Sequence, residues 1–207
     1  MANAELIKNI ILQMAQEIEG NKEYLTGLDA AIGDNDHGIN MNKGFKNAVI
    51  KINGLGSQSI SEIIKAAGMA MISHVGGSAG PLYGTLFLKA AGAAKDKDEI
   101  GLLDFTQMLR EGIDGVKARG KSERHEKTML DVLIPALEAL EESAVAGGSA
   151  KQAFEKALAA AEEGVLYTKT IVATKGRASY LGERSLGHID PGAMSSCLLI
   201  KAIYDLL

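Results

Sequence analysis

The chain has 207 residues, enough for one sizeable domain, and with 46% hydrophobic and 23% charged residues its composition is that of a globular protein rather than a disordered one. The formal net charge of −4 argues against a general electrostatic attraction to nucleic acid or anionic lipid. No segment has the roughly 20 uninterrupted apolar residues of a membrane span, the N-terminus is unlike a secretory signal, and the single cysteine, Cys197, suits a reducing compartment. We therefore expect a cytoplasmic protein that binds neither nucleic acid directly nor membranes.

The hydrophobic pattern is helical almost everywhere. Apolar residues recur at three-to-four spacing, and helix-start signals precede several runs, such as the capping boxes that begin at Ser59 and Ser149. The expected helices cover residues about 4–19, about 38–53, 59 onward, about 81–95, 104 onward, about 128–142, 149 onward, and 190 to the C-terminus. No run alternates as a strand bounded by hairpin signals. The sequence therefore predicts an all-α fold, a single domain over residues 1–207 in which eight helices form an antiparallel up-and-down bundle.

Glycine is unusually frequent, with 24 residues against three prolines, and it gathers in four of the connections. Because glycine costs about 1 kcal/mol in a helix interior, such clusters indicate functional loops. They span residues 27–38, 74–84, 119–129 and 174–192, and they follow the first, third, fifth and seventh expected helices. Alternate connections of an up-and-down bundle lie at the same end, so we expect these four loops to meet and form a site there.

Three aspartates, Asp29, Asp34 and Asp36, stand in the first of these loops, "GLDAAIGDNDHG". Asp34 and Asp36 would point to opposite sides of a helix, but the flanking glycines permit loop conformations in which the carboxylates converge. Carboxylate oxygens favour Mg²⁺ or Ca²⁺ over zinc, and the loop is not an EF-hand because Phe45 occupies the position that needs glutamate. The simpler alternative is that these aspartates only cap the second helix and solvate a loop.

The other loops suggest an anionic ligand. "GGSAGPLYG" and "HIDPGAMSS" each lead into an expected helix, whose N-terminal N–H groups can face an anion, and Lys175 and Arg177 lie nearby. Three carboxylates contribute a charge of about −3 and would repel a phosphate. Two Mg²⁺ ions contribute about +4 and would bridge the carboxylates to the phosphate. We therefore expect a phosphate-bearing ligand held through metal. Of the four histidines, His37 is the best candidate for a ligand contact.

Residues 115–122, "GVKARGKS", match the pattern of a phosphate-binding P-loop. That motif works between a strand and a helix, whereas residues 104–117 follow helical spacing. We therefore reject a P-loop here, although Lys121 could still contact a phosphate as an ordinary loop cation.

Four long motifs, "GLDAAIGDNDHGINMNKGF", "GGSAGPLYGT", "ARGKSERHEKTMLDV" and "GRASYLGERSLGHIDPGAMSS", resemble the ADP-binding L subunits of dihydroxyacetone kinases over essentially the whole chain. The resemblance implies an eight-helix antiparallel barrel with a nucleotide and two Mg²⁺ ions in a cleft at one end. It implies Asp29, Asp34 and Asp36 as the magnesium ligands. The residues that it implies for nucleotide binding are His37, Gly38, Ile39, Asn40, Ser78, Ala79, Gly120, Met129, Arg177, Asp190, Pro191 and Gly192.

The family has two versions, and the resemblance favours the one without a fused substrate domain. In that version ADP stays bound as a coenzyme that cycles with ATP. A phosphohistidine protein of the phosphotransferase system phosphorylates it, and the phosphoryl group passes to dihydroxyacetone on a separate K subunit. No catalytic residue stands out in this chain, which is consistent with a site that the partner completes.

Several points stay open at this stage. The chain could instead be a regulatory coactivator relative or a related kinase domain with another acceptor, such as the fatty acid kinases. The sequence leaves open whether the nucleotide exchanges and whether the chain forms a homodimer. Residues 121–127 are more charged than the resemblance leads us to expect, and no role is assigned to them.

Overall fold

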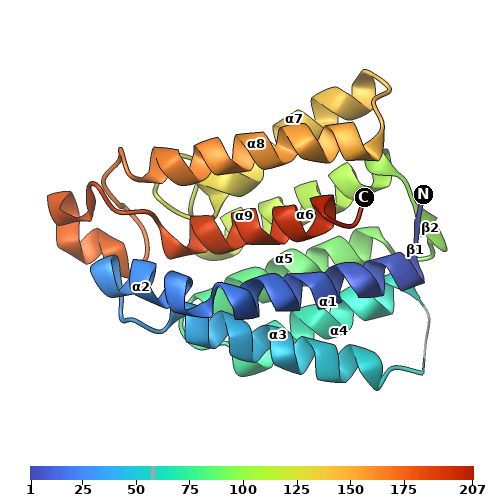
Figure 1. The fold of residues 1–207 in the computed structure, drawn as a ribbon, viewed down its shortest axis with the longest axis horizontal. Coiled ribbons are helices and arrows are strands. Elements are labelled where there is room, and N and C mark those ends of the chain that lie inside the picture. The colour runs from blue at the N-terminus through green and yellow to red at the C-terminus, as the bar shows by residue number, and fades with distance from the viewer. Residues whose placement is uncertain (57–58) are drawn as a thin grey trace.

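The structure is a computed structural model that describes residues 1–56 and 59–207, and this part of the chain is almost entirely helical (Figure 1). The α-helices are α1 (Ala4–Gly20), α2 (Lys22–Ile32), α3 (His37–Asn53), α4 (Ile60–His74), α5 (Ala79–Ala93), α6 (Leu102–Gly120), α7 (Leu130–Val145), α8 (Ala150–Thr168) and α9 (Pro191–Tyr204), and η1 (Arg177–Ser185) is a 3₁₀ helix. Two short strands, β1 (Ala2–Asn3) and β2 (Glu99–Ile100), pair antiparallel. The all-α prediction is confirmed.

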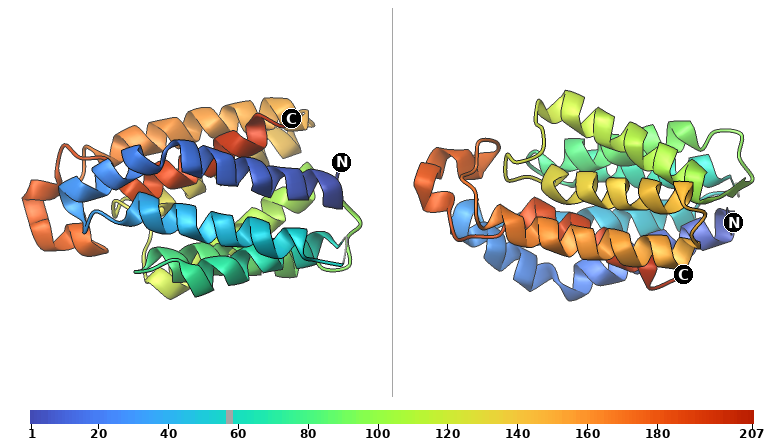
Figure 2. Two further views of the ribbon diagram at one scale, coloured as in Figure 1. Left: turned by 60° about the horizontal axis from the view of Figure 1, so that its bottom comes forward. Right: turned by 90° about the horizontal axis from the view of Figure 1, so that it is seen from above.

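The long helices alternate in direction and close into a ring, which we call the barrel (Figures 1 and 2). Helix α1 packs against α3, the helices from α3 to α9 each pack against the next, and α9 packs against α1. Helix α2 continues the direction of α1 after a break at Asn21. Both chain termini lie at one end of the barrel, and η1 lies at the other (Figure 1).

Two helices were not predicted, and the expected count of eight is therefore wrong for the described residues. Residues 27–38 were expected to be a loop, but α2 extends to Ile32 because Leu25 and Ile32 continue a buried helical face, while Gly27 faces solvent. Helix η1 lies inside the connection expected over residues 174–192. At the third loop, α6 continues to Gly120 and ends at Lys121, which has a left-handed backbone.

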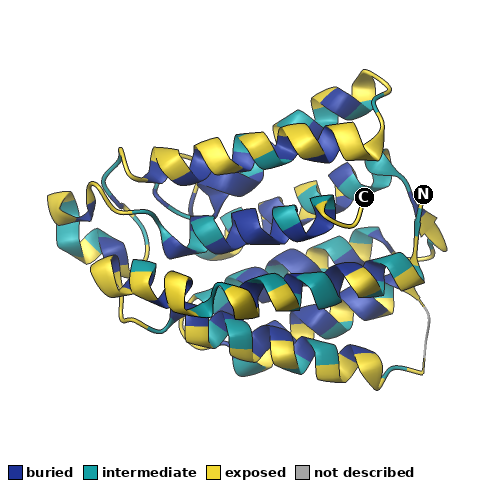
Figure 3. Cartoon of the chain, in the orientation of Figure 1, coloured by how far each residue is buried: buried dark blue, intermediate teal, exposed yellow. Residues whose placement is uncertain are grey.

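The barrel interior is filled by the apolar faces of the ring helices, and their opposite faces meet solvent (Figure 3). Phe45 of α3 and Phe87 of α5 pack edge to face inside it, with ring centroids 6.2 Å apart. None of the helices in the described ranges combines the length and low charge needed to cross a membrane.

A glycine allows α7 and α8 to pack closely at one point. Pro135 lies inside α7 and has no N–H to donate to the carbonyl of Asp131. Gly164 of α8 packs against this carbonyl so tightly that a Cβ atom would lie 2.2 Å from the oxygen. Only a glycine at residue 164 therefore allows α7 and α8 to pack this closely.

Gly164→Ala is expected to lower the free energy of unfolding by about 1–3 kcal/mol, because backbone must move to admit the methyl group. The matched control is Gly92→Ala in the last turn of α5, where a Cβ meets nothing within 4 Å. That change should be neutral or stabilise by up to about 1 kcal/mol. Urea denaturation of both variants checks the pair, and equal stabilities would contradict the packing described here.

Candidate functional site

The connections that follow α2, α4, α6 and α8 meet at one end of the barrel and line a cleft of about 510 Å³. The prediction that the four glycine-rich connections meet at one end is therefore confirmed for the described residues. The cleft volume falls within the roughly 300–1,000 Å³ of small-molecule sites. The predicted site residues that line it are Asp29, Asp34, Asp36, His37, Asn40, Ser78, Ala79, Gly120, Met129, Arg177, Asp190, Pro191 and Gly192. Gly38 and Ile39 are absent from this lining: Gly38 is buried against α2, and Ile39 is 52% exposed.

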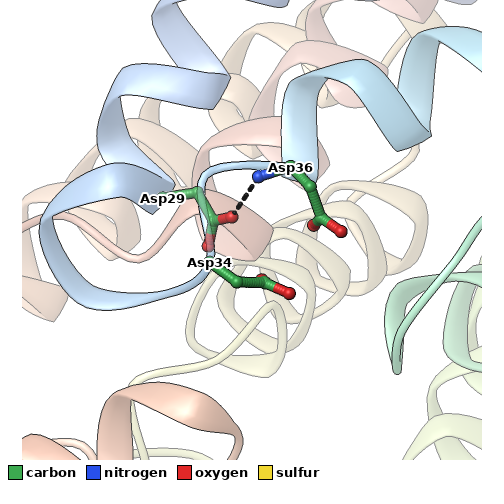
Figure 4. Close-up of side chains that lie close together, drawn as sticks. All are labelled: Asp29, Asp34 and Asp36. Atoms are coloured by element: carbon green, nitrogen blue, oxygen red, sulfur yellow. Dashed lines mark hydrogen bonds between the residues drawn. The ribbon is translucent and has the colours of Figure 1, made fainter.

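The three aspartates converge at the mouth of the cleft, and their nearest carboxylate oxygens all lie within 4.8 Å of one another (Figure 4). Asp29 comes from the last turn of α2, Asp34 from the following bend, and Asp36 from the position just before α3. Only Asp29 acts as a cap: its Oδ2 accepts the N–H groups of Asp36 at 2.9 Å and of His37 at 3.1 Å. Asp36 stands at the cap position of α3 but makes no side-chain cap hydrogen bond, so its carboxylate is left for the cluster.

The cluster carries more negative charge than its neighbours neutralise. Arg177 of η1 forms an ion pair with Asp34 at 2.8 Å. Burial, and then the charge of Asp34, raise the pKa of the Asp36 carboxyl above its ordinary value. Carboxylates held this close repel one another, and an oxygen-preferring divalent cation would relieve that repulsion.

His37 is held by a buried network of hydroxyl groups. Five contacts join its members: His37 Nε2 to Ser195 Oγ (2.9 Å), Ser195 Oγ to Tyr83 OH (2.7 Å), Tyr83 OH to Ser196 Oγ (2.7 Å), and the Gly192 carbonyl to both Tyr83 OH (3.0 Å) and Ser195 Oγ (3.2 Å). Burial lowers the pKa of His37 to about 4, so the ring is neutral at pH 7, with one ring nitrogen as a donor and the other as an acceptor.

Two helix N-termini face the cleft from the other sides. Helix α5 begins at Ala79, after Gly77 with its φ of +63° and Ser78. Helix α9 begins at Pro191, and its Asp190 cap accepts the N–H of Ala193 at 2.7 Å. The first N–H groups of a helix lack intrahelical partners, and the helix dipole makes that end positive. The cleft is thus lined by an acidic cluster and by the first residues of two helices, of which only the start of α5 lacks a side-chain cap.

Asp190 titrates unusually. It is half-buried, and burial raises the pKa of its carboxyl from 3.8 to about 7. Between these two values the folded protein binds a proton that the unfolded chain releases. The contribution of Asp190 to stability is therefore present below about pH 4 and is lost as the pH rises through about 7.

This titration gives a prediction for Asp190→Asn. Without metal or nucleotide, the free energy of unfolding of the wild type minus that of the variant should fall as the pH rises from about 4 to about 7. Urea denaturation at several pH values measures it. A constant difference across this interval would show that Asp190 titrates normally.

Sequence reasoning missed two features of the site. Tyr83 and Ser195 received no role from the sequence, because only the fold brings them beside His37. Lys127 was left without a role within a charged stretch, yet it is 1% exposed and lines the cleft floor. The signal available for it was a lysine that ends a charged run two residues before the buried Met129 and Leu130.

A family model described as the DAK2 domain matches residues 31–205. The chain is 45% identical over 197 residues to the PEP-dependent dihydroxyacetone kinase, ADP-binding subunit DhaL, of Escherichia coli (strain K12), with 95% of this chain and 94% of that protein covered. It is 38% identical over 192 residues to the PTS-dependent dihydroxyacetone kinase, ADP-binding subunit DhaL, of Lactococcus lactis, with 93% and 92% covered. The chain therefore belongs to the DAK2 domain family, in the branch formed by the ADP-binding subunits of dihydroxyacetone kinases.

The fold is also that of a solved kinase. The crystal structure of the dihydroxyacetone kinase of C. freundii in its native form matches with a TM-score of 0.77 at 23% identity. The match covers 99% of this chain and 35% of that one. At this identity the likeness shows the fold alone.

Proposed function

We propose that this chain is the ADP- and Mg²⁺-carrying subunit of a phosphoenolpyruvate-dependent dihydroxyacetone kinase. A phosphohistidine protein of the phosphotransferase system phosphorylates the bound ADP. The phosphoryl group then passes to dihydroxyacetone on a separate K subunit, giving dihydroxyacetone phosphate. The observation that carries the proposal is one cleft lined by three clustered carboxylates and by two helix N-termini, in a chain whose relatives are ADP-binding subunits.

The donor set fits magnesium. Asp29, Asp34 and Asp36 offer only carboxylate oxygens, the ligand type that Mg²⁺ prefers, and their mutual repulsion leaves the cluster short of positive charge. These three side chains would hold two Mg²⁺ ions, which would neutralise charge on the phosphoryl oxygens. Asp29 is held in place by the hydrogen bonds that it accepts at the start of α3, and it would position the two Mg²⁺ ions.

The rest of the cleft would bind the nucleotide. Ser78 and Ala79 at the start of α5 would bind phosphate through N–H groups, and neutral His37 would form a hydrogen bond through Nδ1. Gly38 and Ile39 would contribute only backbone, since their side-chain positions lie outside the lining. The remaining proposed contacts are Asn40, Gly120, Met129, Arg177, Asp190, Pro191 and Gly192.

This chain supplies positioning rather than acid–base chemistry in the proposed reaction. The lining side chains hold phosphate and metal, and the proton of the substrate hydroxyl would be taken by a group on the K subunit. The proposal places the protein in the cytoplasm, with the K subunit and the phosphohistidine protein as partners.

Native mass spectrometry and a reconstituted assay test the proposal together. The purified protein should retain one ADP and two Mg²⁺ ions. With a K subunit and a phosphohistidine donor, the protein should form dihydroxyacetone phosphate. With the K subunit and ATP in place of the phosphohistidine donor, it should form none. Formation from ATP without the phosphohistidine donor would contradict the coenzyme role, and nucleotide retention without product formation would favour a regulatory protein.

A further inference from the structure

We propose that Lys127 is a positioning residue: its buried ammonium ties together the two ends of the 169–190 segment and so fixes the part of the cleft that this segment supplies. The segment links α8 to α9, contains η1, and brings Arg177 and Asp190 to the cleft. The nucleotide-binding consequence rests on the proposed function, whereas the structural consequence does not.

Three backbone carbonyls surround the Lys127 ammonium. Nζ donates to the carbonyl of Thr168 at 2.5 Å, to that of His188 at 2.6 Å and to that of Ile171 at 3.3 Å. An ammonium has three hydrogens, so its donor capacity is filled. Thr168 lies just before the segment and His188 lies near its end, and we call the place where these two ends meet the neck. By binding both carbonyls, Lys127 cross-links the neck.

The ammonium also completes the end of α8. Thr168 is the last residue of α8, and a helix leaves its final carbonyls without intrahelical partners. Helix α8 has no basic residue in its last turn, so the cation that complements its negative end comes from the loop before α7. Burial lowers the pKa of Lys127, while the nearby carboxylates of Asp190 and Asp131 favour its charged form.

The loop around Lys127 is shaped to deliver this side chain inward. The Asp131 carboxylate accepts the N–H of His125 at 2.5 Å and that of Thr128 at 2.8 Å, on either side of Lys127. Lys127 itself has a left-handed backbone with φ of +62°. Such a conformation is uncommon for a lysine, and here it turns the side chain into the interior, where 1% of the residue remains exposed.

The neck has few other bonds across it. The N–H of Gly187 donates to the Lys169 carbonyl at 2.8 Å, and the N–H of Asp190 donates to Thr168 Oγ1 at 3.1 Å.

Beyond the neck, the segment packs Ala173 and Ala178 against Ile32 of α2 in a small apolar cluster. It also has a hydrogen bond from the Thr174 N–H to the Glu126 carbonyl (3.4 Å) and two ion pairs, Lys175–Glu126 (3.7 Å) and the exposed Arg177–Asp34, which is weak in water. None of these joins the two ends of the segment, so removing the ammonium should loosen the segment while the barrel stays intact.

Hydrogen–deuterium exchange of full-length Lys127→Met, without nucleotide, tests this. Amides of residues 170–187 should exchange at least about ten-fold faster than in the wild type, while those of α3 and α4 stay unchanged. The Kd for ADP with Mg²⁺ should rise at least about ten-fold, which corresponds to about 1.4 kcal/mol. The control is Lys156→Met, since Lys156 lies on the exposed face of α8 and outside the cleft lining; it should match the wild type in both measurements.

Unchanged exchange in residues 170–187, or faster exchange spread equally over α3 and α4, would overturn the proposal. Because exchange is measured without nucleotide, failure of the proposed ADP function would leave this result intact. Amine acetylation of the wild type avoids any folding defect of the variant. Lys127 should react at least about ten-fold more slowly than the exposed Lys156, and equal reaction rates would also overturn the proposal.

Discussion

Asp36→Asn is expected to abolish Mg²⁺-dependent retention of ADP and to leave the barrel folded. The change removes one charge from three carboxylates whose oxygens lie within 4.8 Å of one another, while keeping the size of the side chain. We expect ADP affinity in Mg²⁺ to fall at least about 100-fold, or about 2.7 kcal/mol. Asp34→Ala should behave likewise. The ADP content of each purified variant measures the effect.

Without metal, Asp36→Asn should be at least as stable as the wild type, although it binds ADP more weakly. Burial and the charge of Asp34 raise the pKa of Asp36, so its ionised form is disfavoured in the folded protein and a neutral amide should not lower the melting temperature in EDTA. The control is Asp98→Asn, an exposed residue in the connection between α5 and α6 at the other end of the barrel. ADP content like that of the wild type in Asp36→Asn would contradict the metal role.

Gly38→Ala is expected to impair both stability and nucleotide binding. A Cβ at residue 38 would lie 2.0 Å from the Lys22 carbonyl and 2.8 Å from the Thr26 backbone nitrogen. These are backbone atoms of α2, so the start of α3 must move away, and it carries His37 and Asn40 with it. We expect a loss of about 1–3 kcal/mol in the free energy of unfolding and at least about a ten-fold weaker affinity for ADP with Mg²⁺.

Gly27→Ala is the matched control, because it lies in α2 on the exposed side and a Cβ there meets nothing within 4 Å. It should stabilise the protein by about 0.5–1 kcal/mol. Thermal unfolding and ADP titration of both variants separate the two cases. If Gly38→Ala keeps the stability and affinity of the wild type, the close approach of α2 and α3 does not position the site.

The sequence predicted the helical class and the meeting of the four connections, because apolar spacing and glycine clusters are local signals. It misplaced Asp29 in a loop, since Gly27 looked like a helix breaker, whereas the structure places both residues in α2. Glycine on an exposed helix face costs only about 1 kcal/mol, which the burial of Leu25 and Ile32 outweighs.

Lys127 and the Tyr83 network could not be predicted from local patterns. A lysine within "SERHEK" reads as solvated, because lysine is almost never buried without partners. Its partners are carbonyls 41 to 61 residues away, and backbone acceptors leave no trace in a sequence. Ser195 likewise meets His37 across 158 residues of chain.

Calorimetric titration of ADP into the metal-stripped wild-type protein, with and without added Mg²⁺, tests most directly whether acidic side chains bind a polyphosphate through metal. We expect clear binding with Mg²⁺ and at least about 100-fold weaker binding without it. Equal affinity in the presence of chelator would contradict the account, because the carboxylates would then face the phosphates with no cation between them.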